Sequence, residues 1–212
     1  MKISIFGASG STGVLLTERC LAAGHEISVL LRASATFPYR DRVRVVEGSI
    51  FDPGAIRRTL EGSSVVFSTL GARSWAKEDV LERAIPLIVA VMRQKGLSRL
   101  IVLGSAGALP DSLKKQPAYR RWIVENILYK TVLKWPAASQ AAQWKTLAAS
   151  GLDFTMVMPP MLTHGAARGK YRVDGQALPR NGSRISRADV ADFMLQQIGN
   201  PQWVGKGVYI AY

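Results

Sequence analysis

The sequence predicts an α/β fold in which a doubly wound, mainly parallel sheet carries helices on both faces. Short, continuous apolar runs alternate along the chain with longer helical stretches, and this alternation is typical of a parallel sheet that is buried on both faces. The 212 residues are 48% hydrophobic and contain no linker, internal repeat or low-complexity segment. We therefore expect a single domain over residues 1–212 with one sizeable core.

The first half of the chain supplies four of the expected strands, at residues 1–6, 26–31, 43–46 and 64–70. A helix at 11–23 is ended by Gly24, and a second helix to about residue 60 follows Asp52 and Pro53, which suit an N-cap and a first helical turn. A longer helix is expected at 77–95. These elements make two consecutive strand–helix–strand units.

The second half continues the same alternation. We expect a strand at 99–104, helices at 118–135 and 139–149, a strand at 154–158 and a last strand at 207–212. A final helix to about residue 198 begins after Ser186, with Asp189 three residues later in a pair that is typical of a capping box.

The segment GASGSTG places Gly7, Gly10 and Gly13 between the first strand and the first helix. Glycine allows a tight turn there and lets the backbone approach a pyrophosphate closely, and the start of the helix offers N–H groups to phosphate oxygens. A glycine-rich turn can also be only a turn. The strand before it, the helix after it and the second strand within about 30 residues favour a dinucleotide-binding site.

The end of the second strand indicates which dinucleotide is bound. NAD-binding proteins usually place Asp or Glu there for the ribose 2′-hydroxyl, whereas this strand ends in Leu31 followed by Arg32. The guanidinium of Arg32 could pair with a 2′-phosphate, although a solvated surface arginine is the alternative. The sequence therefore predicts NADP(H) rather than NAD(H).

Three motifs together resemble the atypical short-chain dehydrogenase/reductase family, and within it the NmrA-like proteins and the biliverdin reductase B/flavin reductase group. They are GASGSTG, VLLR at 29–32 and VMPP at 157–160, and the C-terminal stretches GKYRV at 169–173 and RISRADVADFML at 184–195 support them. The resemblance covers nearly the whole chain and implies a Rossmann-type fold with NADP(H) over the carboxyl ends of the strands. The cofactor contacts that it implies are Gly7, Ser9, Gly10, Ser11, Thr12, Gly13, Arg32, Leu70, Gly71, Ala72, Arg73, Ser105, Met158, Pro159 and Pro160.

The catalytic residues depart from what this resemblance would lead one to expect. The Tyr-x-x-x-Lys motif of many short-chain reductases is absent, and the positions where relatives carry Lys or His are occupied by Gln140 and Met161. We take Ser105 and Gln140 as the candidate catalytic residues, with Met161, His164 and Trp122 as candidate substrate contacts. These changes affect hydride transfer to a flavin, quinone or similar flat acceptor least, because the proton that such an acceptor takes up can come from water. The alternative is an NADP(H)-binding redox sensor of the NmrA type that has no turnover.

The formal net charge of +13 is the unusual feature of the composition. The cations are scattered, so a basic solvated surface is the first interpretation, an anionic cofactor the second, and nucleic acid the third. We expect a cytoplasmic protein without a transmembrane segment, since no apolar run is long enough to span a bilayer, and no metal site, since there are two histidines and one cysteine.

Residues 119–135 mix apolar and basic side chains. Such a helix can lie on an anionic membrane, but we expect it to pack as a wall over the substrate site or as a homodimer contact. Residues 110–136 and 159–185 are accordingly the expected substrate-site or lid region.

Overall fold

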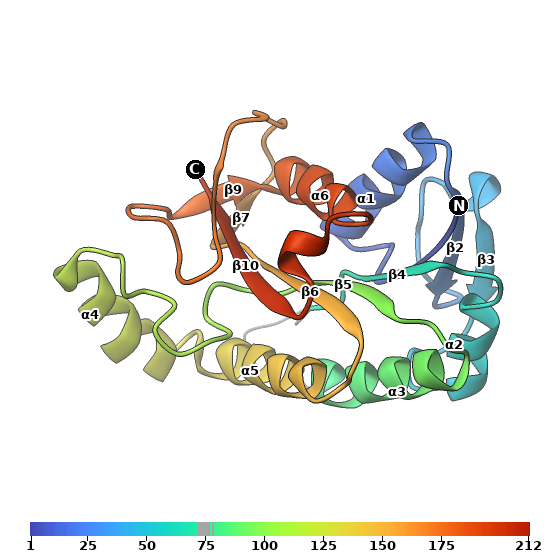
Figure 1. The fold of residues 1–212 in the computed structure, drawn as a ribbon, viewed down its shortest axis with the longest axis horizontal. Helices are drawn as coiled ribbons and strands as arrows, with labels where there is room; N and C mark the ends of the chain where they lie inside the picture. The colour runs from blue at the N-terminus through green and yellow to red at the C-terminus, as the bar shows by residue number, and fades with distance from the viewer. Residues whose placement is uncertain (72–76, 78) are drawn as a thin grey trace.

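The computed structural model describes residues 1–71, 77 and 79–212 and contains a twisted sheet of eight strands (Figure 1). The strand order is β3-β2-β1-β4-β5-β6-β10-β8, and the described pairs are parallel except for β10 with β8. The strands are β1 (Lys2–Phe6), β2 (Glu26–Leu31), β3 (Arg44–Glu47), β4 (Val65–Ser68), β5 (Arg99–Leu103), β6 (Asp153–Met158), β8 (Arg172–Asp174) and β10 (Lys206–Ala211).

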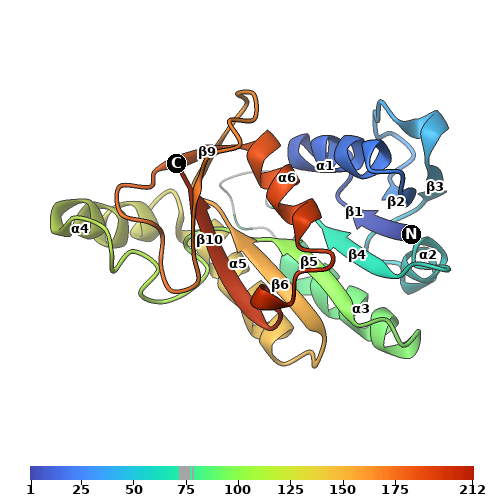
Figure 2. The same ribbon diagram turned by 45° about the horizontal axis from the view of Figure 1, so that its top comes forward.

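Helices cover both faces of this sheet, as Figures 1 and 2 show. On one face lie α1 (Ser11–Ala22) and α6 (Arg187–Gln196), which pack against each other. On the other face lie α2 (Pro53–Thr59), α3 (Val80–Gln94) and α5 (Lys134–Ala148). Each interface buries its own apolar cluster, because a strand covered on both sides alternates its side chains between the two layers. The predicted fold class is confirmed.

Several short elements were not predicted from the sequence. The strands β7 (Met161–Thr163) and β9 (Arg184–Ser186) form a separate two-stranded parallel sheet, and β8 closes the edge of the large sheet. Each has only three residues, which is too short for an alternating pattern to be recognised. In addition, α3 begins at Val80, three residues later than expected.

The single helix expected over residues 118–135 is wrong. The chain forms α4 (Ala118–Asn126), then the 3₁₀ turn η2 (Leu128–Lys130), and α5 begins only at Lys134. Thr131 leaves the helical region with φ −120° and ψ −103°, and its hydroxyl donates to the carbonyl of Ile127 (2.7 Å). Pro136 then lies in the first turn of α5, where a missing backbone N–H leaves no intrahelical bond unmade.

The α4 segment lies on the surface of the protein. None of the residues of α4 is buried, and the segment is attached to the core through half-buried Val124 and, in η2, Tyr129.

Among the residues that the structure describes, every helix is too short or too polar to cross a lipid bilayer.

The predicted cap of α6 is confirmed and belongs to a larger network. Ser186 accepts the backbone N–H of Asp189 (3.0 Å) and donates its hydroxyl to the Asp189 carboxylate (2.8 Å). That carboxylate, only 1% exposed, also accepts the backbone N–H groups of Arg168 and Gly169 and the hydroxyl of Tyr212. Burial alone would raise the pKa of Asp189, but the hydrogen bonds from Tyr212, Arg168, Gly169 and Ser186 outweigh it, and the pKa lies below its ordinary value.

We expect Asp189→Asn to lower the free energy of unfolding by about 2 kcal/mol at neutral pH, since an amide nitrogen cannot accept the N–H groups that face the carboxylate. A depressed pKa stabilises the fold above the unfolded value of about 4 and loses that contribution as the pH falls through the folded value. Urea unfolding at several pH values measures this difference. The difference between the wild type and the variant should begin to shrink below pH about 4 and should disappear once the pH is below the lower folded pKa of Asp189. Exposed Asp41→Asn should change little, and a constant difference down to that pH would contradict the role given to the ionised carboxylate.

Candidate functional site

The glycine turn after β1 brings three backbone segments unusually close together. Gly7 has φ +81°, and its carbonyl accepts the N–H of Gly10 (3.0 Å). A Cβ on Gly13 would lie 2.2 Å from the Gly7 oxygen, and a Cβ on Gly7 would lie 2.8 Å from the carbonyl carbon of Thr69. Glycine is therefore required at both positions, and the start of α1 rests directly on the turn.

The start of α1 is open to an incoming anion. Gly10 is the N-cap, no side chain caps it, and the first turn holds no acidic residue. Ser9, Gly10 and Ser11 are exposed, whereas Thr12 and Gly13 are buried beneath them. The free N–H groups and the positive end of the helix dipole thus face solvent at the carboxyl edge of the sheet, which is the arrangement that binds phosphate.

A cavity of about 530 Å³ lies beside this turn. Five of the predicted cofactor residues line it: Gly7, Ser9, Arg32, Leu70 and Gly71. The exposed Arg32 follows β2 directly, so its side chain belongs to the rim of the cavity. The structure therefore brings together the glycine turn, the cation after β2 and the chain after β4, as expected for parallel strands whose carboxyl ends share one edge.

The same cavity has a wall that the sequence reasoning missed. Gly48, Ser49, Ile50 and Phe51 follow β3 and line the cavity together with Leu30, Ala33 and Val80. A Cβ on Gly48 would lie 2.8 Å from that of Ala55, so the chain passes close to α2 at this point. Residues 48–51 follow the carboxyl end of β3, and they reach the cavity because β3 pairs with β2. The apolar side chains of Ile50 and Phe51 would suit one face of a flat ring.

A second group of predicted residues lies further along the carboxyl edge. The backbone N–H of Ala106 donates to the carbonyl of Pro159 (2.9 Å), and this bond places Ser105, after β5, beside the end of β6. Met158 and Pro159 are buried, while Ser105 and Pro160 are half-buried. This group does not line the cavity described above.

Gln140 is oriented by its neighbour on α5. Its side-chain oxygen accepts a hydrogen bond from Gln143 (3.2 Å), and Gln143 also donates to the carbonyl of Leu103 at the end of β5 (3.2 Å). The Gln143 side chain is fully buried, and its own oxygen has no hydrogen-bond partner among the described residues. The pair therefore joins α5 to the same strand end that leads to Ser105.

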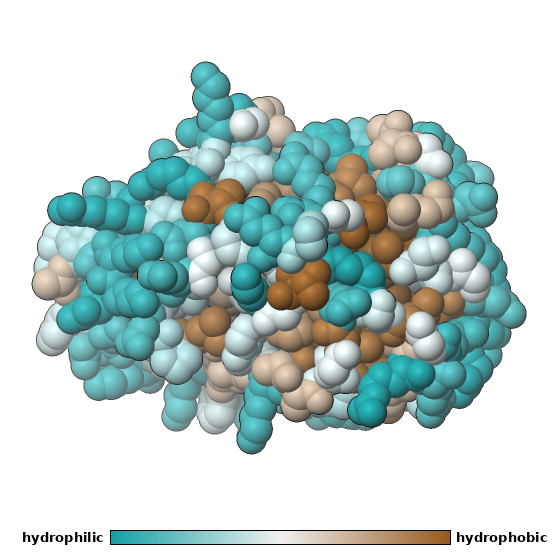
Figure 3. All heavy atoms as spheres, viewed as in Figure 1, coloured by the Kyte–Doolittle hydropathy of each residue, from teal (hydrophilic) through white to brown (hydrophobic). Residues whose placement is uncertain are grey.

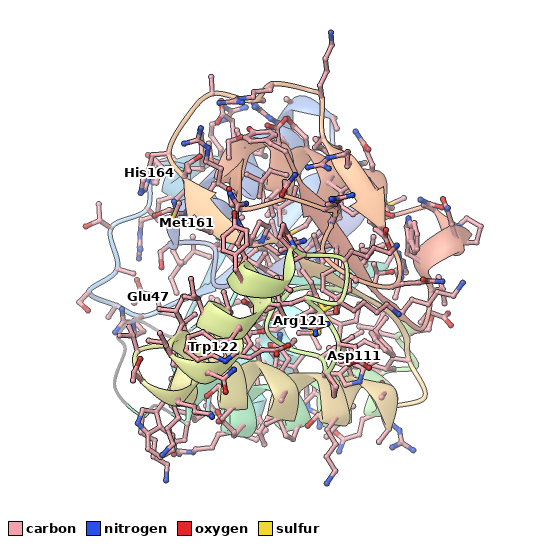
Figure 4. The ribbon with its side chains drawn as sticks, turned by 90° about the vertical axis from the view of Figure 1, so that its left-hand side faces the viewer. Glu47, Asp111, Arg121, Trp122, Met161 and His164 are labelled. Atoms are coloured by element: carbon pink, nitrogen blue, oxygen red, sulfur yellow. The ribbon has the colours of Figure 1, made fainter. Side chains whose placement is uncertain are left out.

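The predicted substrate contacts are exposed. Trp122 and Met161 are 59% and 65% exposed, and His164 is exposed as well. Figure 4 shows Trp122, Met161 and His164 on the same side of that view, with Arg121 and Asp111 toward the other side. Ala72 and Arg73 lie outside the described residues.

Comparison with known proteins finds relatives that align over almost the whole chain. A curated relative, the uncharacterised protein YwnB of Bacillus subtilis, is 28% identical and aligns over 95% of this chain and 94% of its own. A short-chain dehydrogenase/reductase from Veillonella parvula, solved in complex with NADP, superposes with a TM-score of 0.79 at 20% identity, over 100% of this chain and 94% of its own.

Two further solved structures carry reductase names. ChuY, an anaerobillin reductase from Escherichia coli O157:H7, superposes with a TM-score of 0.81 at 22% identity, over 100% of this chain and 97% of its own. SP1627, a putative NADH-flavin reductase from Streptococcus pneumoniae, does so with a TM-score of 0.77 at 21% identity, over 100% and 99%.

These structures share the fold of this chain, which agrees with the Rossmann-type fold that the motif resemblance implies. The family model described as NAD(P)H-binding matches residues 7–201, from the glycine turn to beyond α6. The chain therefore belongs to the NAD(P)H-binding family.

Proposed function

We propose that the protein is an NADPH-dependent reductase that passes a hydride to a flavin, a quinone or a similar flat small-molecule acceptor. The observation that carries the proposal is the cavity at the glycine turn, which has Arg32 at its rim and Leu70 and Gly71 on its wall. Further along the same edge lie Ser105 and Pro159, where the reacting end of an extended dinucleotide would be held.

The residues present fit such a cofactor. Gly7 and Gly13 let the start of α1 pack directly on the turn, and the uncapped start of α1 would supply N–H groups to a pyrophosphate. Arg32 would take a 2′-phosphate, and residues 48–51 would take the adenine side. Bound NADPH would supply the hydride, while the protein supplies orientation.

The class of acceptor is inferred from the side chains near the carboxyl edge of the sheet that lie away from the cavity at the glycine turn. Gln140 and Met161 cannot donate a proton in the way that Lys or His could, so an acceptor whose proton comes from water is favoured. Ser105 remains the candidate for a hydrogen bond to the cofactor or acceptor, and Trp122 and Met161 offer apolar surface to a flat ring. The reductase names of two structural neighbours support this reading.

The lack of a proton-donating side chain at Gln140 and Met161 also favours a second candidate function. A protein that binds NADP(H) without a proton donor at Gln140 and Met161 could act as a redox sensor that reports the cofactor to a partner. The two candidates differ in turnover only, so one measurement separates them.

We expect the pure protein to oxidise NADPH faster than a no-protein blank when one of FMN, riboflavin, biliverdin or a simple quinone is added. Absorbance of NADPH measures the rate, and heat-denatured protein is the control. Tight binding of NADPH without oxidation by any acceptor would favour the sensor. Failure to bind either nicotinamide dinucleotide would overturn the proposed function altogether.

We expect Arg32→Ala to weaken NADPH binding by roughly 10- to 100-fold, because a charge-assisted hydrogen-bonded pair is lost, and to leave NADH binding nearly unchanged. Isothermal titration with both nucleotides measures the two affinities. Arg93→Ala on the exposed side of α3 removes the same charge elsewhere and should alter neither. Equal weakening of NADPH and NADH by Arg32→Ala would contradict a 2′-phosphate contact.

A further inference from the structure

Two segments far apart in the sequence lie on the β8 side of the sheet, and we call them together the basic end: residues 111–136, including α4, and residues 161–187. In Figures 1 and 2 α4 lies at one extreme of the molecule, and part of the second segment rises as a loop above β7 and β9. The N–H of Leu178 donates to the carbonyl of Ser112 (2.8 Å), and the Gln116 side chain donates to the carbonyl of Leu178 (2.9 Å). Lys115 forms an ion pair with Asp174 (2.5 Å). The two segments therefore present a common surface.

Most of the net charge of the chain lies in this end. Its two segments hold 12 Lys and Arg against 3 Asp and Glu, which gives +9, whereas the remaining residues hold 16 against 12, which gives +4. Arg168, Lys170 and Arg172 also line a shallow depression together with Tyr171 and Tyr212. Arg172 donates to the main-chain oxygens of Arg180 (2.6 Å) and Tyr212 (2.5 Å), and these contacts fix its guanidinium beside the depression.

The same end exposes apolar side chains. Of the nine large hydrophobic side chains that are exposed among the described residues, eight lie in it and only Met1 does not. They are Tyr119, Trp122, Ile123, Ile127, Val132, Trp135, Met161 and Val173. On the face visible in Figure 3 this end is mostly hydrophilic, and Figure 4 shows Trp122 and Met161 together on one side.

We propose that the basic end docks on the surface of an anionic lipid bilayer. The short helix α4 exposes aromatic and branched aliphatic side chains, contains Arg120 and Arg121 and is followed by Lys130 and Lys134, and this composition is that of an interfacial helix. The apolar side chains would enter the boundary between headgroups and acyl chains, and the cations would pair with lipid phosphates. The proposal does not depend on the reductase activity.

Charge decides against a second copy of the chain as the occupant. A two-fold interface at this end would bring two surfaces of about +9 each into contact, and like charges facing each other at an interface are strongly unfavourable. Nucleic acid would satisfy the cations, but it would leave Ile123, Ile127 and Val132 in water, since these side chains neither stack on bases nor pair with phosphates. An anionic bilayer satisfies both kinds of side chain.

Sedimentation with lipid vesicles tests the proposal in the full-length protein. We expect binding to vesicles rich in phosphatidylglycerol, much weaker binding to phosphatidylcholine alone, and loss of affinity as salt is raised. Arg120→Gln with Arg121→Gln should weaken binding on the order of tenfold or more, because each surface cation contributes to attraction. Ile123→Ser with Ile127→Ser should weaken it on the order of tenfold without changing the charge.

The matched control is Arg57→Gln with Arg58→Gln on α2, which removes two exposed charges from another part of the molecule and should leave binding nearly unchanged. Circular dichroism confirms that each variant is folded. The proposal is overturned if the wild type does not bind phosphatidylglycerol vesicles, or if the control pair weakens binding as much as the α4 pairs. It is also overturned if the isoleucine pair dissociates a dimer seen by sedimentation velocity, or if duplex DNA binds more tightly than the vesicles do.

Discussion

The close approach of Gly7, Gly13 and Thr69 is the constraint on which the nucleotide end of the structure depends. Thr69 donates its hydroxyl to the carbonyl of Gly7 (3.0 Å), and a Cβ on Gly13 would meet that same hydroxyl at 2.8 Å. The start of α1 is thereby held over the carboxyl ends of β1 and β4. The strand order reverses there, since the chain goes outward to β2 and β3 before it returns to β4, so the crevice opens at this point.

A buried carboxylate, that of Asp189, holds together the part of the structure around the start of α6. Asp189, rather than a backbone approach, gathers the start of α6, the chain at Arg168 and Gly169 and the ring of Tyr212 around one buried carboxylate. Arg168 also lies over the Tyr212 ring at 4.2 Å from its centre. One buried charge therefore holds three segments of the chain together.

The sequence predicted those parts of the molecule in which local chemistry and tertiary packing agree. Apolar runs predicted the long strands, Asp52–Pro53 and Ser186 predicted helix starts, and the glycine turn was placed correctly beside Arg32 and Leu70. It failed where the outcome depends on partners distant in sequence. The three-residue strands exist only because neighbours pair with them, and the break at Thr131 overrides a helical pattern that continues through it. Residues 48–51 have no motif of their own and become a wall only when β3 lies beside β2.

The positively charged side chains of the protein have two roles, and the electrostatic interactions in these roles act over different distances. Arg32 lies at the cavity and can pair directly with a phosphate, a contact that salt weakens little once it is desolvated. The cavity is lined by residues that follow β1, β2, β3 and β4, whereas β8 is at the opposite edge of the sheet and α4 lies on that side in Figure 1. At physiological ionic strength, charges more than about 8 Å apart in solvent are largely screened from each other. The cations of the basic end therefore add little to cofactor affinity. Since exposed apolar side chains accompany these cations and not Arg32, the excess charge is better explained by a surface that the protein meets than by the nucleotide that it binds.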